Sequence, residues 1–351
     1  MAIIPLDIQL LVVEWLYRLS QHQFAIDYHT LRACALVCSA WRPVAQRLLF
    51  RRVPRQPGLP FGGIFLLDVT LLLDILRTRP HLAAHVRTIR LFLESAYADA
   101  VDAQLMLLEV CPHVACLYIE IDTEIVPHML KFAIPQHIQS VILPFEHEDV
   151  NAILKLWPDL RAIEITRGVI PGVDEIPLIR IPSGVLSLSV PASVITQIFV
   201  TADDLPALRD LELGAITSRS YTELLPTLCA SGLLPRLRTL VLDGPLPPAE
   251  VLDQLEQLES LIFQELPNED VIFPKTLRHI GCHYSCDPEP ERASFLVAAL
   301  RSLDGLQLVT VAGLFRRTRA VLMDACRELD VECVTLETSE HFPRPRDVDW
   351  I

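Results

Sequence analysis

A short pattern of apolar positions recurs along the chain from residue 86 onward. The pattern is Φ-x-x-Φ-x-Φ, in which Φ is an apolar residue, and its eleven copies lie 19 to 29 residues apart, 24.5 on average. The copies begin at residues 86, 114, 138, 160, 185, 208, 237, 258, 277, 306 and 331. Because 51% of the residues are hydrophobic, chance would produce single copies, but chance would not space them so evenly. The alternating end of each copy predicts a short strand with one buried face.

Helical patterns fill several of the intervals between these copies. Apolar residues return every three or four positions over residues 99–111, 146–157, 247–258, 290–303 and 316–329. Proline precedes six of the copies, where it would end a helix before the next strand. Strand, loop and helix repeated in this order predict an α/β fold. We expect parallel strands that alternate with helices in an irregular solenoid over residues 81–337.

The first 53 residues have a purely helical periodicity and predict three short helices. Their apolar faces are Ile8, Leu11, Val12, Leu16 and Leu19, then Leu31, Cys34, Ala35 and Cys38, then Trp41, Val44, Ala45, Leu48 and Leu49. Thr30 and Ser39 are placed to cap the second and third helices. A unit of this size buries its own apolar surface poorly. Either the rest of the chain covers Leu36, Val37 and Trp41, or they form an exposed patch for a partner.

Three motifs in this segment carry a family resemblance. They are IPLDI at residues 4–8, LRACALVCSAW at 31–41 and LLFRRV at 48–53. Together they resemble the F-box, the adaptor-binding helical module of SCF-type ubiquitin ligases, and the layout is especially similar to that of mushroom-type fungal F-box proteins. Ile4 stands for the usual Leu, Asp7 stands for the usual Glu, and residues 20–29 form a polar insert.

The resemblance implies a function and a set of contacts. An F-box over residues 1–53 would bind a Skp-type adaptor and, through the adaptor, a cullin scaffold. The residues that would face the adaptor are Pro5, Ile8, Leu36, Val37, Cys38 and Trp41. The chain would then be a substrate receptor that holds a client protein near the ubiquitin-charged enzyme and contributes proximity instead of chemistry. The alternative is a non-catalytic interaction scaffold without ubiquitin transfer.

The body resembles the leucine-rich-repeat domains that often follow an F-box, in a degenerate form. Residues 54–80 would be a linker and a first helix, and residues 338–351 a tail. In such a solenoid the residues beside the Φ positions point to the open sheet face, which is used for binding. On this geometry we nominate a client-binding face of Arg90, Tyr118, Glu120, Glu164, Asp210, Glu212 and Asp243. Its acidic bias suits a basic client segment, and the alternative is ordinary solvated surface.

Charge and cysteine content narrow the list of partners. The net charge is −14, with +4 on residues 1–60 and −18 on the remaining 291 residues. Because phosphate binding needs a positive surface, we expect neither a nucleic-acid nor a membrane partner, whereas a basic head suits an acidic adaptor. Nine scattered cysteines predict a reduced, intracellular chain, cytoplasmic or nuclear. Charged residues interrupt the apolar stretches 1–19 and 64–76, so we expect no signal peptide or membrane span.

Candidate chemistry is sparse. His279, Cys282, His283 and Cys286 are zinc-type ligands, but on a strand Cys282 would point away from the two histidines. We therefore predict no metal and no cofactor. Neither a glycine-rich phosphate loop nor a catalytic pairing is recognisable, so we nominate no catalytic residue and predict that the chain is not an enzyme. An enzyme built on a Cys or Ser of the body is the third possibility.

Overall fold

The computed structural model describes most of the chain in two compact units, Met1–Leu160 and Arg161–Ile351. The described residues are 11–12, 28–53, 65–93, 98–121, 123–132, 134–143, 150–166, 179–192, 205–214, 228–265, 267, 270–283, 290–312 and 316–336. Each unit is built from parallel strands that alternate with helices, which confirms the predicted α/β class.

The strands of the first unit pair in the order of the chain. They are β1 (Arg52–Val53), β2 (Thr88–Leu93), β3 (Cys116–Ile121) and β4 (Ser140–Leu143). All pairs are parallel, and equivalent positions of successive copies lie opposite each other: Ile89 pairs with Leu117, and Leu117 with Val141. These three side chains are fully buried. The repeat period therefore sets the register, since a one-residue slip would turn every apolar residue to the other face.

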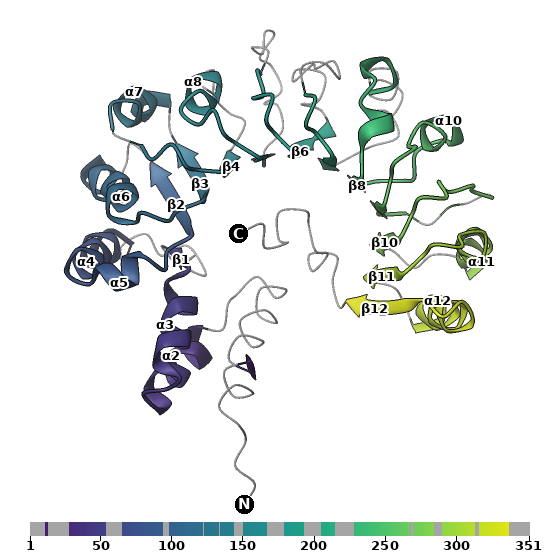
Figure 1. Ribbon diagram of the computed structural model, residues 1–351, viewed down its shortest axis with the longest axis horizontal. Helices are drawn as coiled ribbons and strands as arrows, with labels where there is room; N and C mark the ends of the chain where they lie inside the picture. The colour runs from purple at the N-terminus through teal and green to yellow at the C-terminus, as the bar shows by residue number, and fades with distance from the viewer. Residues whose placement is uncertain are drawn as a thin grey trace, which may run out of the picture. The chain divides into compact units, whose positions relative to one another are not determined.

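Helices of the first unit cover one side of its strands, as Figure 1 shows for α4, α6 and α7 beside β2 and β3. The helical elements are α2 (Tyr28–Val37), α3 (Arg42–Phe50), α4 (Phe65–Thr78), α5 (Pro80–Ala83), α6 (Ala98–Val110), the 3₁₀ turn η2 (Thr123–Ile125), α7 (Val126–Met129) and α8 (Val150–Leu154). The buried Gln104 joins α6 to β2: its amide nitrogen donates to the Phe92 carbonyl at 2.7 Å, and its oxygen accepts from the Phe92 amide at 2.6 Å.

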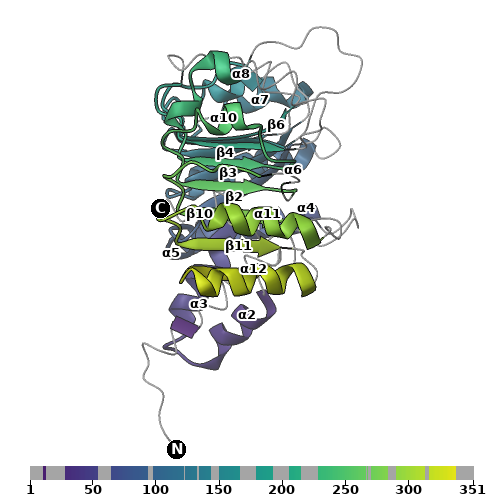
Figure 2. The same cartoon turned by 90° about the vertical axis from the view of Figure 1, so that its right-hand side faces the viewer.

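The second unit continues the same scheme with more strands. They are β5 (Ala162–Ile165), β6 (Ser187–Pro191), β7 (Asp210–Gly214), β8 (Thr239–Leu242), β9 (Ser260–Phe263), β10 (His279–His283), β11 (Leu308–Ala312) and β12 (Glu332–Leu336). Every neighbouring pair is parallel. Its helical elements are η4 (Leu234–Arg236), α10 (Ala249–Leu252), α11 (Pro290–Leu300) and α12 (Arg316–Glu328). Figure 2 shows the axes of α11 and α12 running along the direction of β11.

All eleven predicted strands are present as β2 to β12. In the first ten copies, all three Φ residues are buried, from Val86 to Val311. For the eleventh copy, the predicted burial was wrong. The register pairs Val309 with Cys333 and Thr310 with Val334, so the Φ residue Val334 lies on the face opposite the helices. A turn after α12 leads into this register: Asp330 has a left-handed φ of 56°, and the Val331 amide donates to the Cys326 carbonyl at 2.9 Å.

Two predicted helices are shorter than their apolar patterns, and two predicted caps are wrong. Helix α10 covers only four residues of 247–258, because the copies on either side of it are 21 residues apart and leave room for about one helical turn. Within 146–157, helix is described only for α8. Helix α2 already contains Thr30, and the N-cap of α3 is Trp41 with no side-chain cap bond, so neither Thr30 nor Ser39 is an N-cap.

Candidate functional site

Leu36 and Val37 form an exposed apolar pair at the C-terminal end of α2. Leu36 is 76% exposed and Val37 is 64% exposed, whereas Leu31 and Cys34 of the same helix are buried. Single exposed apolar residues are common on protein surfaces, but adjacent large ones are typical of interaction sites. The pair is therefore a candidate contact for a partner helix.

The helical hairpin α2–α3 holds only a small core of its own. Leu31, Cys34, Ala45 and Leu48 form this core, and Trp41 packs at its edge as a partly buried side chain. The Trp41 ring is thus neither sealed beneath the chain nor fully exposed. Cys38 lies beyond the end of α2 and is exposed. Pro5 and Ile8 lie outside the described residues.

The same hairpin is strongly basic. Residues 28–53 contain five arginines and no aspartate or glutamate. Arg32, Arg42, Arg47 and Arg52 are exposed. Positive charge on the hairpin that carries the apolar pair would accelerate association with an acidic partner and orient it.

On the first unit's sheet face opposite the helices, Arg90 is held by an aromatic and acidic cluster. Its Nη2 donates to Oε1 of Glu120 at 2.6 Å. Its guanidinium carbon lies 4.1 Å from the ring centroid of Tyr118 and 4.5 Å from that of Phe92. The cluster brings together the three predicted residues Arg90, Tyr118 and Glu120. Fixed aromatic and arginine side chains of this kind are enriched at protein interfaces.

Phe92 is a member of this cluster that our sequence-based prediction missed. The hexamer ends at Leu91, but the alternation continues through Leu93, and this places Phe92 on the same face as Arg90. That signal was present in the sequence. Tyr118 also pairs across the sheet with Ile142 of β4, so the cluster adjoins an apolar side chain.

The predicted acidic residues of the second unit lie on the sheet face opposite the helices, but they differ in exposure. Glu164 and Asp210 are 9% and 8% exposed, Glu212 is half-buried and Asp243 is exposed. Burial raises the pKa of Asp210, and a hydrogen bond from Thr239 opposes the increase. A client would therefore reach Asp243 and part of Glu212 more readily than the other two carboxylates.

This face of the second unit is not open throughout, contrary to our expectation. Val241 and Ile262, which pair across β8 and β9, are 8% and 2% exposed, and Ala312 of β11 is fully buried with them. Parallel sheets are usually covered on both faces, and the residues of a covered face are apolar.

His279 lies between two hydroxyl groups on this face. Its Nδ1 is 2.9 Å from the Ser260 hydroxyl oxygen, and its Nε2 is 3.0 Å from the Thr310 hydroxyl oxygen. A neutral imidazole has one donor and one acceptor nitrogen, which matches two hydroxyl partners. Burial lowers the pKa of His279 to about 4. A histidine with so low a pKa is a weak general base at neutral pH, which disfavours activation of Ser260 as a nucleophile.

We expect acidification to destabilise the protein through His279. The folded-state pKa of about 4 lies below the unfolded value of 6.5, so the unfolded chain binds more protons between these two values. Stability is lost as the pH falls below about 6.5, and the loss ends near pH 4. Between pH 7 and pH 5 it amounts to about 2 kcal/mol. Urea unfolding of the protein and of His279→Gln, which keeps a donor and an acceptor, measures this contribution. Parallel pH profiles for the two proteins would contradict the prediction.

Cys326 and Cys333 form a thiol pair where α12 leads into β12. The hydrogen bond between them lowers the pKa of Cys333 to about 7 and raises that of Cys326. Both line a surface hollow with Met323, Arg327 and Val331. A thiol with this pKa is substantially ionised at neutral pH, which makes Cys333 a candidate for labelling by activity profiling.

His279 and Cys282 point to opposite faces of β10, and Cys282 is fully buried on the helix side. Cys286 lies outside the described residues. Across the described ranges, no group of three or more His, Cys, Asp or Glu side chains is placed to hold a metal ion. Among the helices that the structure describes, none has the length and apolarity to cross a bilayer.

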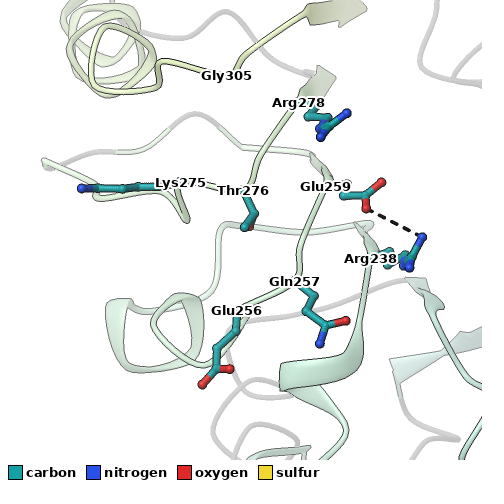
Figure 3. A pocket seen from close by; sticks show the side chains of 8 residues that line it. All are labelled: Arg238, Glu256, Gln257, Glu259, Lys275, Thr276, Arg278 and Gly305. Atoms are coloured by element: carbon teal, nitrogen blue, oxygen red, sulfur yellow. Dashed lines mark ion pairs between the residues drawn. The ribbon is translucent and has the colours of Figure 1, made fainter.

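A second hollow lies at the N-terminal ends of β8, β9 and β10, and our sequence-based predictions did not include it. It is lined by Arg238, Glu256, Gln257, Glu259, Lys275, Thr276, Arg278 and Gly305 (Figure 3). The repeat contains a signal for it. The second position of the hexamer is Arg in five copies, those starting at residues 86, 160, 208, 237 and 277. No family model matches the chain, and no curated protein matches it.

Proposed function

We propose that the chain is a substrate-receptor subunit of an SCF-type ubiquitin ligase. Its N-terminal segment would be an F-box that binds a Skp-type adaptor, and its body a degenerate leucine-rich-repeat-like solenoid that binds a client protein. The observation that carries the proposal is the exposed pair Leu36 and Val37, on a basic helical hairpin whose own core is small. An adaptor helix that covered this pair would complete the core.

The body supports the proposal through its architecture. A short strand, followed by a helix or loop that leads back to the start of the next strand, recurs about every 25 residues. Every strand pair is parallel within each unit. Such arrays expose extended surfaces and serve mainly in binding. The client would contact the sheet face that carries Arg90, Tyr118 and Glu120 in the first unit, and Glu212 and Asp243 in the second.

Co-purification tests this function and separates it from a scaffold without ubiquitin transfer. The whole chain is co-expressed with a Skp-type adaptor and a cullin, and captured by a tag on the chain. We expect both partners to be retained in stoichiometric amounts. Recovery of adaptor without cullin would favour the interaction scaffold. If neither partner is retained while circular dichroism shows a folded chain, the receptor proposal is wrong.

A further inference from the structure

A row of exposed arginines marks the N-terminal ends of the strands in the second unit. Arg161, Arg209, Arg238 and Arg278 each precede a strand by one residue, ahead of β5, β7, β8 and β10, and all four are exposed. Backbone hydrogen bonds hold the row in register. The Arg238 amide donates to the Arg209 carbonyl at 2.7 Å, and the Arg278 amide donates to the Glu259 carbonyl at 2.9 Å.

The strand spacing fixes the dimensions of this arginine row. Neighbouring strands lie about 4.8 Å apart, so Arg209 and Arg238 are adjacent, while Arg238 and Arg278 are about 10 Å apart. From β5 to β10 the row extends over roughly 24 Å. Because the guanidinium groups are carried by backbone positions of a hydrogen-bonded sheet, their spacing is set before any ligand arrives.

Two carboxylates lie beside the row, Asp210 and Glu259. Asp210 is 8% exposed and interacts electrostatically with Arg209 and Arg238. Arg238 Nη1 lies 3.8 Å from Glu259 Oε1, and both side chains are about half exposed, at 47% and 49%. In the part of the chain that the structure describes, Arg161, Arg209 and Arg278 make no ion pair within 4.0 Å. Figure 3 shows the side chains of Arg238, Glu259 and Arg278 together on one side of the strand starts, with Lys275 pointing the other way. Four guanidinium groups thus face two carboxylates, of which Asp210 is buried, so the exposed charge of the row is positive and favours a bound anion.

We propose that the arginine row binds an acidic segment of the client in extended conformation. Each guanidinium can hold a carboxylate with two parallel hydrogen bonds. Side chains on one face of an extended peptide recur about every 6.6 Å, and seven or eight residues cover the row. This inference deepens the proposed function by naming the chemistry of the client, and it rests on that function only for identifying the peptide as a client.

Glu259 favours a peptide over a nucleic acid as the ligand. A polynucleotide presents a phosphate at every step and would place one opposite Glu259, whereas a peptide can place a neutral or basic residue there. The net charge of −14 also opposes a long polyanion. The row therefore suits a short acidic segment that has a neutral or basic residue opposite Glu259.

Fluorescence anisotropy tests the proposal with the whole chain. The probe is a labelled eight-residue peptide with glutamate at alternating positions, measured at about 50 mM and about 300 mM salt, because exposed ion pairs weaken with ionic strength. We expect saturable binding that weakens at the higher salt. Arg209→Glu with Arg238→Glu should weaken binding at least tenfold, and Arg209→Gln with Arg238→Gln should weaken it less. The matched control, Arg77→Glu with Arg79→Glu, makes the same charge change on the first unit and should bind as the wild type does.

Three results would overturn the inference. They are no binding of the peptide to the wild type, an equal loss in the control, and tighter binding of a single-stranded oligonucleotide of equal charge. If the variant with two glutamates does not fold, the variant with two glutamines serves as the test. Peptide binding by that variant with wild-type affinity would overturn the inference. Adaptor retention, measured on the same variants, keeps the two proposals apart. Retained adaptor with lost peptide binding supports both, whereas peptide binding by a chain that retains no adaptor removes the receptor function alone.

Discussion

Replacing Trp157 by alanine is expected to lower the free energy of unfolding of the first unit by about 3–5 kcal/mol. Trp157 follows α8 and is fully buried. Its indole nitrogen donates to the Pro135 carbonyl at 3.0 Å, so the ring also supplies a partner to a backbone group of the preceding repeat. The substitution removes the largest fully buried side chain of the described core and leaves both a cavity and a carbonyl without its donor.

Urea unfolding monitored by circular dichroism measures this effect. Trp157→Phe should cost less, because it keeps most of the ring and loses mainly the hydrogen bond, worth about 1–2 kcal/mol. Ile272→Ala is the surface control: its side chain is 78% exposed, and substitutions of this kind change stability by less than about 0.5 kcal/mol. A loss below about 1.5 kcal/mol for Trp157→Ala would show that the ring does not pack as tightly as its burial indicates.

Leu36→Asp is expected to weaken binding of a Skp-type adaptor at least a hundredfold while the chain stays folded. In the unbound chain the side chain is 76% exposed, so the substitution costs little stability. In the complex the carboxylate would be buried in an apolar contact without a partner, which costs several kcal/mol. A hundredfold change corresponds to about 2.7 kcal/mol, so this estimate lies at the low end of the penalty.

Ile272→Asp provides the matched control, because Ile272 is 78% exposed in the second unit and undergoes the same chemical change. Surface plasmon resonance with immobilised adaptor should give wild-type affinity for Ile272→Asp and a severe loss for Leu36→Asp. Val37→Asp, at a position that is 64% exposed, should behave as Leu36→Asp does. Equal affinities for all four proteins would place the adaptor contact elsewhere or remove it.

The strands and their order followed from the sequence because the apolar pattern is periodic and local. Each hexamer carries its own burial information, and a parallel array of short repeats pairs neighbours in chain order. Residues such as Leu117, Leu211 and Leu261 are buried where the pattern predicted. The prediction for the last copy was wrong because β12 pairs one residue earlier than the pattern implies: Val309 lies opposite Cys333 instead of Val334. Either face of β12 could have been the apolar one, since Val331, Cys333, Val334 and Leu336 are all apolar.

The sequence predicted the sheet face of the site residues correctly, but it did not predict which of them are exposed. Arg90, Tyr118 and Glu120 meet, as alternation on adjacent strands requires. Glu164 and Asp210 lie on the corresponding face of the second unit but are buried, because exposure depends on neighbours from other repeats. Our sequence-based prediction overlooked the arginine row. The second position of these hexamers lies just before the strand, and we had considered only residues that point to one of the two faces of a strand.

The sequence by itself determined the repeat period, the α/β class, the strand order and the residues that fill the core, because these depend on side-chain polarity along short stretches. Only the tertiary structure decided which outward residues remain accessible, how Arg90 is held between two rings, and that arginines from separate repeats form one row. Those properties depend on distances between residues 20 or more positions apart, which the register of neighbouring strands sets and no local pattern contains.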